Sequence, residues 1–151
     1  MKQATLLFLL KDNQILLALK KRGFGQGRWN GVGGKPEKNE KILDTAIRET
    51  QEEVGVIAKN ISQVATLDFY FRNKQKWNQQ VLVFTTNKWE GEPSESEEVK
   101  PQWFHIDQIP FKSMWPDDQF WLPLVLSGKK IQAEFTFDDN NIILDKKINE
   151  I

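Results

Sequence analysis

The chain has 151 residues and no cysteine, and its 21 lysines and arginines balance its 21 aspartates and glutamates. Without cysteine it has no disulfide, no thiolate nucleophile and no cysteine-based zinc site. A nucleic-acid-binding chain normally carries a clear basic excess, so we expect no polymeric nucleic-acid partner. The length fits one compact domain, and we predict a single domain over residues 1–151.

The apolar beginning of the chain, residues 1–10, is compatible with a signal peptide or with a buried strand. The run is short, and Lys11 and Asp12 follow it without a small-residue cleavage site, which favours the strand. No stretch reaches the roughly 18 apolar residues of a membrane-spanning helix. We therefore expect a soluble, cytoplasmic monomer without a membrane partner, and nuclear and organelle pools stay open.

The first half of the chain is predicted to form two strands, a loop and a helix. Apolar runs indicate strands over residues 5–10 and 14–19. A basic, glycine-rich loop follows, with a short extended segment near residues 29–32. Residues 39–54 have helical periodicity, with Asn39 as N-cap and Gly55 as C-terminal stop. The apolar stripe of this helix is predicted to be Leu43, Ala46, Ile47, Thr50 and Val54.

The second half is predicted to contain further strands and a second helix. An acidic loop spans residues 91–98, and a short helix spans residues 117–126. The predicted strands are residues 64–72, 80–86, 99–106, 131–137 and 141–144. This order of elements predicts an α/β fold in which a mixed sheet is covered by helices on both sides.

Three glutamates crowd one side of the first predicted helix. With about 100° of rotation per residue, Glu49 lies about 60° from Glu52 and about 40° from Glu53. Carboxylates held this close repel one another unless a cation lies between them. Hard oxygen ligands suit Mg²⁺ or Mn²⁺, and Mg²⁺ commonly shares its coordination shell with substrate phosphates. An ordinary solvated acidic face is the alternative, but it does not explain the glycines placed before and after the helix.

The segment from Gly34 to Val56 resembles the Nudix box, G-x5-E-x7-R-E-U-x-E-E-x-G-U, in which U is a bulky aliphatic residue. Thr50 stands at the first U position and is the one departure. Threonine is β-branched and close to valine in shape, so we expect its packing to be preserved. The matching residues are Gly34, Glu40, Arg48, Glu49, Glu52, Glu53, Gly55 and Val56.

The resemblance implies an α/β/α sandwich in which the box forms a loop–helix–loop. It implies Mg²⁺ as cofactor, with Mn²⁺ as a substitute. Glu49, Glu52 and Glu53 would bind the metal with the backbone carbonyl of Gly33. Either Glu52 or Glu53 would assist the attacking water, and Arg48 would orient the carboxylates.

Two more residues follow from the same resemblance. Glu40 would tie the loop of the box to its helix. A further metal ligand would come from the later acidic loop, where Glu98 is our choice and Glu97 and Glu95 are alternatives.

Two further segments, residues 20–31 and 115–118, resemble the oxidised-purine nucleoside triphosphatases, the 8-oxo-dGTP diphosphatase branch of the Nudix family. This resemblance implies that Asn30, Asp117 and Asp118 bind the edge of a base and that Trp115 stacks on its face. An aromatic face of this kind supports a flat ring. The other residues implied at the pocket are Phe24, Phe69, Phe71, Thr5 and, near its mouth, Lys20.

Taken singly, these residues have ordinary structural explanations. Asp117 follows Pro116 and is placed to cap the second helix, Trp115 fits a core position, and Phe24 fits simple packing. Their joint match favours base recognition. His105 is the single histidine, and we assign it no role.

The predicted function is Mg²⁺-dependent hydrolysis of oxidised purine nucleoside triphosphates to nucleoside monophosphate and diphosphate, which sanitises the nucleotide pool. The substrates would be 8-oxo-dGTP and oxidised dATP. One alternative is a Nudix hydrolase of another nucleoside diphosphate derivative, such as a nucleotide sugar or dinucleoside polyphosphate. The other is a Nudix-like binding module without activity, although such a module would be expected to lack carboxylates of the box. The sequence does not rank oxidised against methylated purines.

Overall fold

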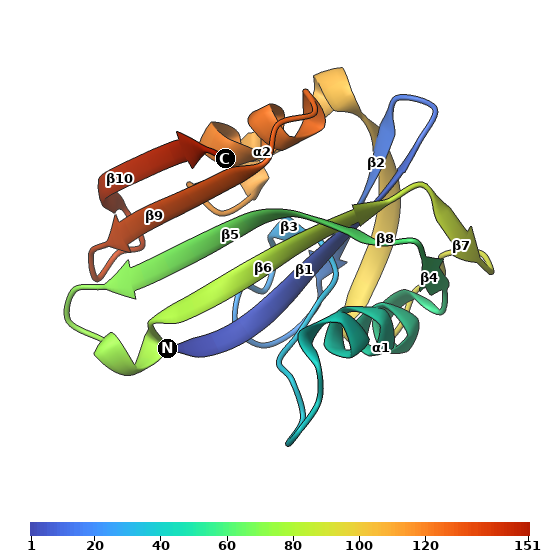
Figure 1. Cartoon of the computed structure of the whole chain (residues 1–151), viewed down its shortest axis with the longest axis horizontal. Helices are drawn as coiled ribbons and strands as arrows, with labels where there is room; N and C mark the ends of the chain where they lie inside the picture. The colour runs from blue at the N-terminus through green and yellow to red at the C-terminus, as the bar shows by residue number, and fades with distance from the viewer.

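The computed structural model describes all residues, 1–151, and is built around a mixed eight-stranded sheet (Figure 1). The strand order is β10-β9-β5-β6-β1-β2-β3, and β8 pairs with β2. The pairs β1/β6 and β5/β9 are parallel, and the others are antiparallel. The strands are β1 (Lys2–Lys11), β2 (Gln14–Lys20), β3 (Trp29–Asn30), β5 (Ser62–Phe71), β6 (Gln79–Thr86), β8 (Val99–His105), β9 (Ile131–Phe137) and β10 (Ile143–Glu150).

Two α-helices lie on opposite faces of this sheet (Figure 1). The helix α1 (Ile42–Val54) packs through Ala46 and Val54 onto the face that carries Leu7 and Leu9. The helix α2 (Asp118–Leu126) packs onto the other face. The alternation of side chains along a strand explains this division, because neighbouring residues of β1 point to opposite faces. The α/β sandwich expected from the sequence is therefore confirmed.

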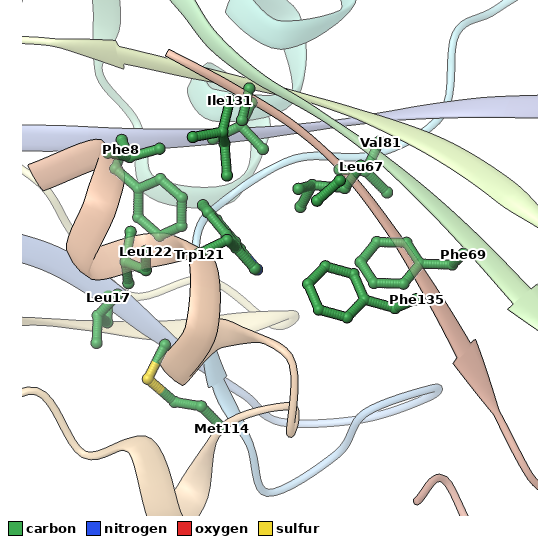
Figure 2. Packing of buried hydrophobic residues seen from close by; sticks show 14 of the residues in the cluster. Phe8, Leu17, Leu67, Phe69, Val81, Met114, Trp121, Leu122, Ile131 and Phe135 are labelled. Atoms are coloured by element: carbon green, nitrogen blue, oxygen red, sulfur yellow. The ribbon is translucent and has the colours of Figure 1, made fainter. Parts of the chain in front are cut away.

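The larger of the two cores lies between the sheet and α2 (Figure 2). Trp121 and Leu122 of α2 are fully buried there, close to Phe8 of β1. Phe69 of β5 and Phe135 of β9 stack at 5.8 Å between ring centroids. The burial of Trp121 and Leu122 fixes α2, and with it the loop that precedes α2, against the sheet.

The first helix is shorter than predicted. It begins at Ile42, after Lys41, and Asn39 does not cap it, because Asn39 has a φ of +64° and belongs to the preceding turn. Leu43 is 49% exposed, whereas Thr45 is fully buried, so the predicted apolar stripe is wrong at its first position. The predicted end is confirmed, since Gly55 has a φ of +76° and donates its backbone N–H to Gln51 at 3.0 Å.

The other predicted elements are confirmed with changed ends. The last strand begins at Ile143 and runs to Glu150, instead of spanning residues 141–144, because Asn141, with a φ of +60°, lies in a turn that is closed by Asp138. Five short elements were not predicted: β4 (Ile57–Lys59) and β7 (Lys88–Glu90), which pair with each other, and the 3-10 turns η1 (Gln75–Trp77), η2 (Ile106–Gln108) and η3 (Phe111–Ser113). None of the helices is both long and apolar enough to cross a membrane.

Candidate active site

The Gly33–Gly34 segment, which precedes α1, is held tightly between β1 and α1. The backbone N–H of Thr5 donates to the Gly34 carbonyl at 2.8 Å, and the Thr5 hydroxyl lies 3.3 Å from both the N and the O of Gly34. A Cβ atom at Gly33 would lie 1.8 Å from the Thr5 carbonyl oxygen, and one at Gly34 would lie 2.3 Å from the Glu49 carboxyl carbon. The backbone contact at Gly33 leaves no room for a side chain, whereas at position 34 the Glu49 carboxyl would have to move. This close approach brings the loop against the carboxylates of α1.

Two glutamates of α1 meet this loop in a partly buried setting. Glu53 accepts a hydrogen bond from the backbone N–H of Gly33 at 3.3 Å. Burial raises the pKa of Glu53 to about 7 against the opposing effect of that hydrogen bond, and burial also raises the pKa of Glu49. Glu52, by contrast, has a side chain that is 57% exposed. Glu53 is thus a largely buried carboxylate without a cationic hydrogen-bond partner, whereas the charge of Glu49 is partly compensated by Arg48.

Arg48 links the loop to the carboxylates of the helix. Its Nε and Nη2 donate to the two Glu40 oxygens at 2.8 and 2.9 Å. Its Nη2 also reaches the Lys35 carbonyl at 3.1 Å. Its Nη1 donates to Glu49 at 2.9 Å and to Glu52 at 3.2 Å. The two-pronged pair with Glu40 fixes the direction of the guanidinium. Arg48 therefore restrains the other two glutamates that it binds, Glu49 and Glu52.

Glu40 joins the loop to the start of α1, as the sequence predicted. Its carboxylate accepts from the Thr45 hydroxyl at 2.7 Å and from the Glu37 backbone N–H at 3.1 Å. The hydrogen bond from Arg48, followed by these two, lowers the pKa of Glu40 to about 2. Glu40 therefore stays ionised and holds Arg48 in place at any pH near neutrality.

The residues of α1 and its loop fit a hard divalent cation by their chemistry. Glu49, Glu52 and Glu53 offer only oxygen donors, which Mg²⁺ and Mn²⁺ prefer. The buried charge of Glu53, which accepts only a backbone N–H, favours a cation beside it. No three acidic or histidine side chains converge into a complete ligand set in the structure, because Arg48 draws Glu49 and Glu52 to itself.

The acidic loop is tied to the basic loop by ion pairs. Glu98 accepts from Arg22 at 2.6 and 2.8 Å and lies 3.4 Å from the Lys20 ammonium. The hydrogen bond from Arg22 lowers the pKa of Glu98. Glu97 lies 3.7 Å from Arg22. Such exposed pairs add little stability, but they place Glu98 beside Lys20. Glu95, the other alternative ligand, lies against Lys21 instead.

A second group of predicted residues gathers around Trp115, just before α2. Trp115 is half-buried and outside both cores, so its interpretation as a core residue is wrong. Phe24 stacks on it with 5.0 Å between ring centroids and is 59% exposed, so it is not simple packing either. The Arg28 guanidinium lies 4.2 Å from the indole and donates to the Met114 carbonyl at 3.1 Å.

Asp117 and Asp118 are buried side by side, each only 3% exposed. Asp117 precedes α2 without a capping side-chain bond, so the capping interpretation is wrong. Its Oδ2 accepts from the Trp121 indole N–H at 2.8 Å, while Oδ2 of Asp118 has no partner. Burial raises the pKa of Asp117, and burial together with the neighbouring Asp117 charge raises that of Asp118 well above its ordinary value. One carboxyl of the pair is therefore neutral under conditions in which an exposed aspartate is ionised.

The remaining predicted residues are divided between the surface of the site and the core. Asn30 is half-buried on β3 and accepts from the Gly31 backbone N–H at 2.8 Å. Phe69 and Phe71 are 9% and 7% exposed and belong to the core under α2. Thr5 is buried beneath Gly34. These three side chains thus lie beneath the surface of the site in this structure.

Sequence reasoning missed three residues of this region. Arg28 lies within the basic loop but had been given no role. Trp121 follows Asp117 by four residues, a spacing that places both side chains on one helix face and that could have suggested their contact. Trp77 lies 5.6 Å from Phe24 between ring centroids, and no signal in the polar segment around it indicates this contact.

Known proteins match this chain over most of its length. A family model described as "NUDIX domain" matches residues 1–125. The chain belongs to the Nudix family. This Nudix chain is 44% identical over 147 residues to a mouse (Mus musculus) protein named "Oxidized purine nucleoside triphosphate hydrolase", covering 97% of this chain and 94% of that protein. It is 40% identical over 150 residues to a zebrafish (Danio rerio) protein of the same name, covering 99% and 96%.

A solved structure extends the likeness to the whole fold. The MutT protein of Bacillus halodurans superimposes on this Nudix chain with a TM-score of 0.88 at 26% sequence identity, covering 99% of this chain and 98% of that one. The sheet and both flanking helices therefore follow the Nudix fold from end to end.

Proposed function

We propose that this Nudix hydrolase cleaves oxidised purine nucleoside triphosphates, 8-oxo-dGTP and oxidised dATP among them, to nucleoside monophosphate and diphosphate. The observation that carries the proposal is the buried Asp117–Asp118 pair beside Trp115 and Phe24. The two vertebrate relatives that match nearly the whole chain bear the corresponding name. The proposed role for the cell is removal of damaged bases from the nucleotide pool.

The aspartate pair suits recognition of an oxidised base. A neutral carboxyl can donate a hydrogen bond to a ring oxygen, and an ionised carboxylate accepts from ring N–H groups. Oδ2 of Asp118 has no partner within the protein, and a buried polar atom of this kind gains most from a ligand that satisfies it. Trp115 would then stack on the base, and Asn30 would bind its edge.

The other half of the proposed site binds the triphosphate. Glu49, Glu52 and Glu53, with the Gly33 carbonyl and Glu98, would hold Mg²⁺ or, as a substitute, Mn²⁺. When bound, the divalent cation neutralises charge on the phosphates. Arg48 keeps Glu49 and Glu52 oriented, Lys20 meets the phosphates at the mouth, and Glu52 or Glu53 takes the proton of the attacking water. Water attacks the β-phosphorus, the bond from that phosphorus to the oxygen shared with the α-phosphorus breaks, and the nucleoside monophosphate leaves with that oxygen while the β- and γ-phosphates leave as diphosphate.

Two other functions are less well supported. Hydrolysis of a nucleotide sugar or dinucleoside polyphosphate is less well supported, because both relatives that match nearly the whole chain are named for oxidised purine nucleoside triphosphates. A binding module without activity would not need the intact set of box carboxylates, of which Glu53 is buried without a cationic hydrogen-bond partner. The cytoplasm is the compartment that we propose, with a monomer as the working form.

The proposal is tested by hydrolysis of a panel of purified triphosphates, namely 8-oxo-dGTP, 2-hydroxy-dATP, dGTP, dATP and dCTP. We expect the oxidised purines to have the highest kcat/KM and the products to be nucleoside monophosphate and diphosphate, resolved by chromatography. Equal rates for damaged and normal purines would contradict the preference for oxidised bases. Release of orthophosphate instead of diphosphate would contradict the position of cleavage.

A further inference from the structure

Trp77 is a partly exposed aromatic residue that belongs to none of the motifs of the chain. It ends the turn η1 between β5 and β6, at the end of the sheet near the N-terminus (Figure 1). Its side chain lies edge-on to Phe24 at 5.6 Å and edge-on to Phe71 at 5.8 Å between ring centroids. Trp77 thus contacts both the basic loop, through Phe24, and the last residue of β5, Phe71.

The position of Trp77 is fixed by its own turn. Its backbone N–H donates to the Lys74 carbonyl at 2.8 Å, and the N–H of Asn78 donates to Gln75 at 3.0 Å. The Asn78 side chain accepts from the Phe71 backbone N–H at 2.7 Å, which ties the turn to β5. The Lys74 ammonium lies 4.3 Å from the centroid of the Trp77 ring. The backbone that carries the indole is therefore held by hydrogen bonds, and the ring itself packs on Phe71.

Phe24 is held much less firmly. It is 59% exposed and lies between Gly23 and Gly25, whose φ angles are +81° and +84°. These backbone conformations favour glycine, so the loop combines an exposed apolar ring with a permissive backbone. Its ring packs against Trp115 on one side and meets Trp77 on another. Because an exposed phenylalanine gains little elsewhere, these aromatic contacts determine where the ring lies.

We propose that Trp77 is a positioning residue that holds Phe24 beside Trp115 and thereby sets where the Phe24 ring lies against a bound purine. Trp77 acts through Phe24 and need not touch the phosphates or the reacting atoms. Its loss therefore weakens binding of the base and leaves the chemical step intact. The inference rests on the proposed function in one respect only, that the ligand is a purine nucleotide.

The first test compares Trp77→Leu with wild type by steady-state kinetics. Leucine keeps an apolar group over Phe71 but lacks the ring edge that meets Phe24. We expect KM to rise about three- to tenfold, in line with the loss of one aromatic pair, with kcat within twofold of wild type. Trp77→Phe, which restores an aromatic edge, should recover most of the loss. A fall in melting temperature with KM unchanged would show that Trp77 only covers the core, and would overturn the proposal.

A double substitution tests whether Trp77 acts through Phe24. In Phe24→Ala protein, adding Trp77→Leu should raise KM no further, because the ring that Trp77 positions is already absent. Losses that multiply would overturn the proposal, since Trp77 would then act independently of Phe24. Trp89→Leu is the matched control. Trp89 is a half-buried tryptophan on β7, stacked on Trp103 at 5.7 Å on the far side of the molecule, and its replacement should leave KM unchanged.

The substrate is chosen so that this inference and the proposed function fail separately. All variants are measured with the purine triphosphate that wild type hydrolyses fastest, whether or not its base is oxidised. If normal dGTP is that substrate, the preference for oxidised bases is wrong, while a rise in KM for Trp77→Leu still supports the aromatic role. If 8-oxo-dGTP is the best substrate and Trp77→Leu binds it as wild type does, the inference fails and the proposed function stands.

Discussion

The two halves of the site are built on different principles. Around α1, charged side chains form a network whose members lie within one short segment of the chain, from Gly34 to Glu53, and Glu52 within it is largely exposed. Around Trp115, the residues come from distant segments, and the decisive carboxyls are buried. In the proposed function, the first half would act on any phosphate anhydride, whereas the second would distinguish one base from another. The comparison suggests that reaction chemistry and substrate choice can be changed separately.

The largest expected effect breaks the first half alone. Removing divalent metal with excess chelator should abolish hydrolysis, and Mg²⁺ should restore it. Glu53→Gln should lower kcat about 10²- to 10³-fold while the protein stays folded, because one carboxylate of the reaction centre is lost and the core is unchanged. Steady-state kinetics measure hydrolysis and kcat, and a melting curve shows whether the variant stays folded. Near wild-type turnover in Glu53→Gln and Glu52→Gln alike would reduce α1 to a solvated acidic face.

A matched control lies in the same network. Glu40 binds Arg48 through both oxygens but stands at the loop rather than among the predicted ligands. Glu40→Gln should therefore lower kcat less than Glu53→Gln does. If the two substitutions reduced kcat equally, the distinction between supporting and reacting carboxylates would be wrong.

The next largest effect reorders substrates. Asparagine at position 118 keeps the shape of aspartate but presents a permanent NH₂ donor and cannot ionise. The amide resembles the neutral carboxyl of Asp118 but cannot switch to an ionised acceptor. A base that needs position 118 to accept from its ring N–H groups then faces a donor, at a cost of about 1–3 kcal/mol, or roughly five-fold to over a hundred-fold in kcat/KM, whereas a base that accepts from position 118 is spared. Asp117→Asn should reorder substrates by a different pattern, because Asp117 is the carboxyl bonded to Trp121. Equal losses for every substrate would remove the pair from base recognition.

A smaller and less selective effect is expected at Trp115. Stacking on an indole does not depend on the edge pattern of the base. Trp115→Ala should therefore raise KM about tenfold for oxidised and normal purines alike, within the roughly 1–3 kcal/mol of one stacked base. The ratio of KM values between substrates is the measurement. An unfolded Trp115→Ala protein would restore the core interpretation.

The smallest effect is a dependence of stability on pH. Burial raises the pKa of Asp118, with the Asp117 charge adding to the shift and Arg28 opposing it. The folded protein then binds a proton more tightly than the unfolded chain, so the free energy of unfolding falls as pH rises above the ordinary aspartate pKa of about 3.9. Asp118→Asn lacks this titration. The melting temperature of Asp118→Asn should therefore rise relative to that of wild type as pH increases above about 4, and a difference that stays constant with pH would contradict the raised pKa.

Much of the fold could be predicted because its signals are local. The periodicity of β9 and the box of α1 need only a few neighbouring residues to be recognised. The errors arose where local signals compete. Asn39 is a good N-cap by type, yet its left-handed conformation places it in the turn before the helix. Thr45 is polar, yet its hydroxyl is satisfied by Glu40, which allows it to be buried where Leu43 was expected.

The residues of the first half of the candidate site could be predicted from the sequence more fully than the contacts of the second half. The box carboxylates are recognisable from spacing, because their roles follow from one helix face. The contacts of Trp77, Arg28 and Phe24 depend on how separate loops meet, and no spacing within one segment encodes that meeting. The involvement of Glu98 in ion pairs with Lys20 and Arg22 likewise depends on the approach of two loops.

The separation of the two halves is tested most directly by one set of kinetic measurements. Values of kcat/KM for 8-oxo-dGTP, 2-hydroxy-dATP and dGTP are compared among wild type, Glu53→Gln and Asp118→Asn. We predict that Glu53→Gln lowers all three by a common factor and preserves their order, whereas Asp118→Asn changes the order. A change of order in Glu53→Gln, or a uniform loss in Asp118→Asn, would contradict the assignment of chemistry to α1 and of base recognition to the aspartate pair.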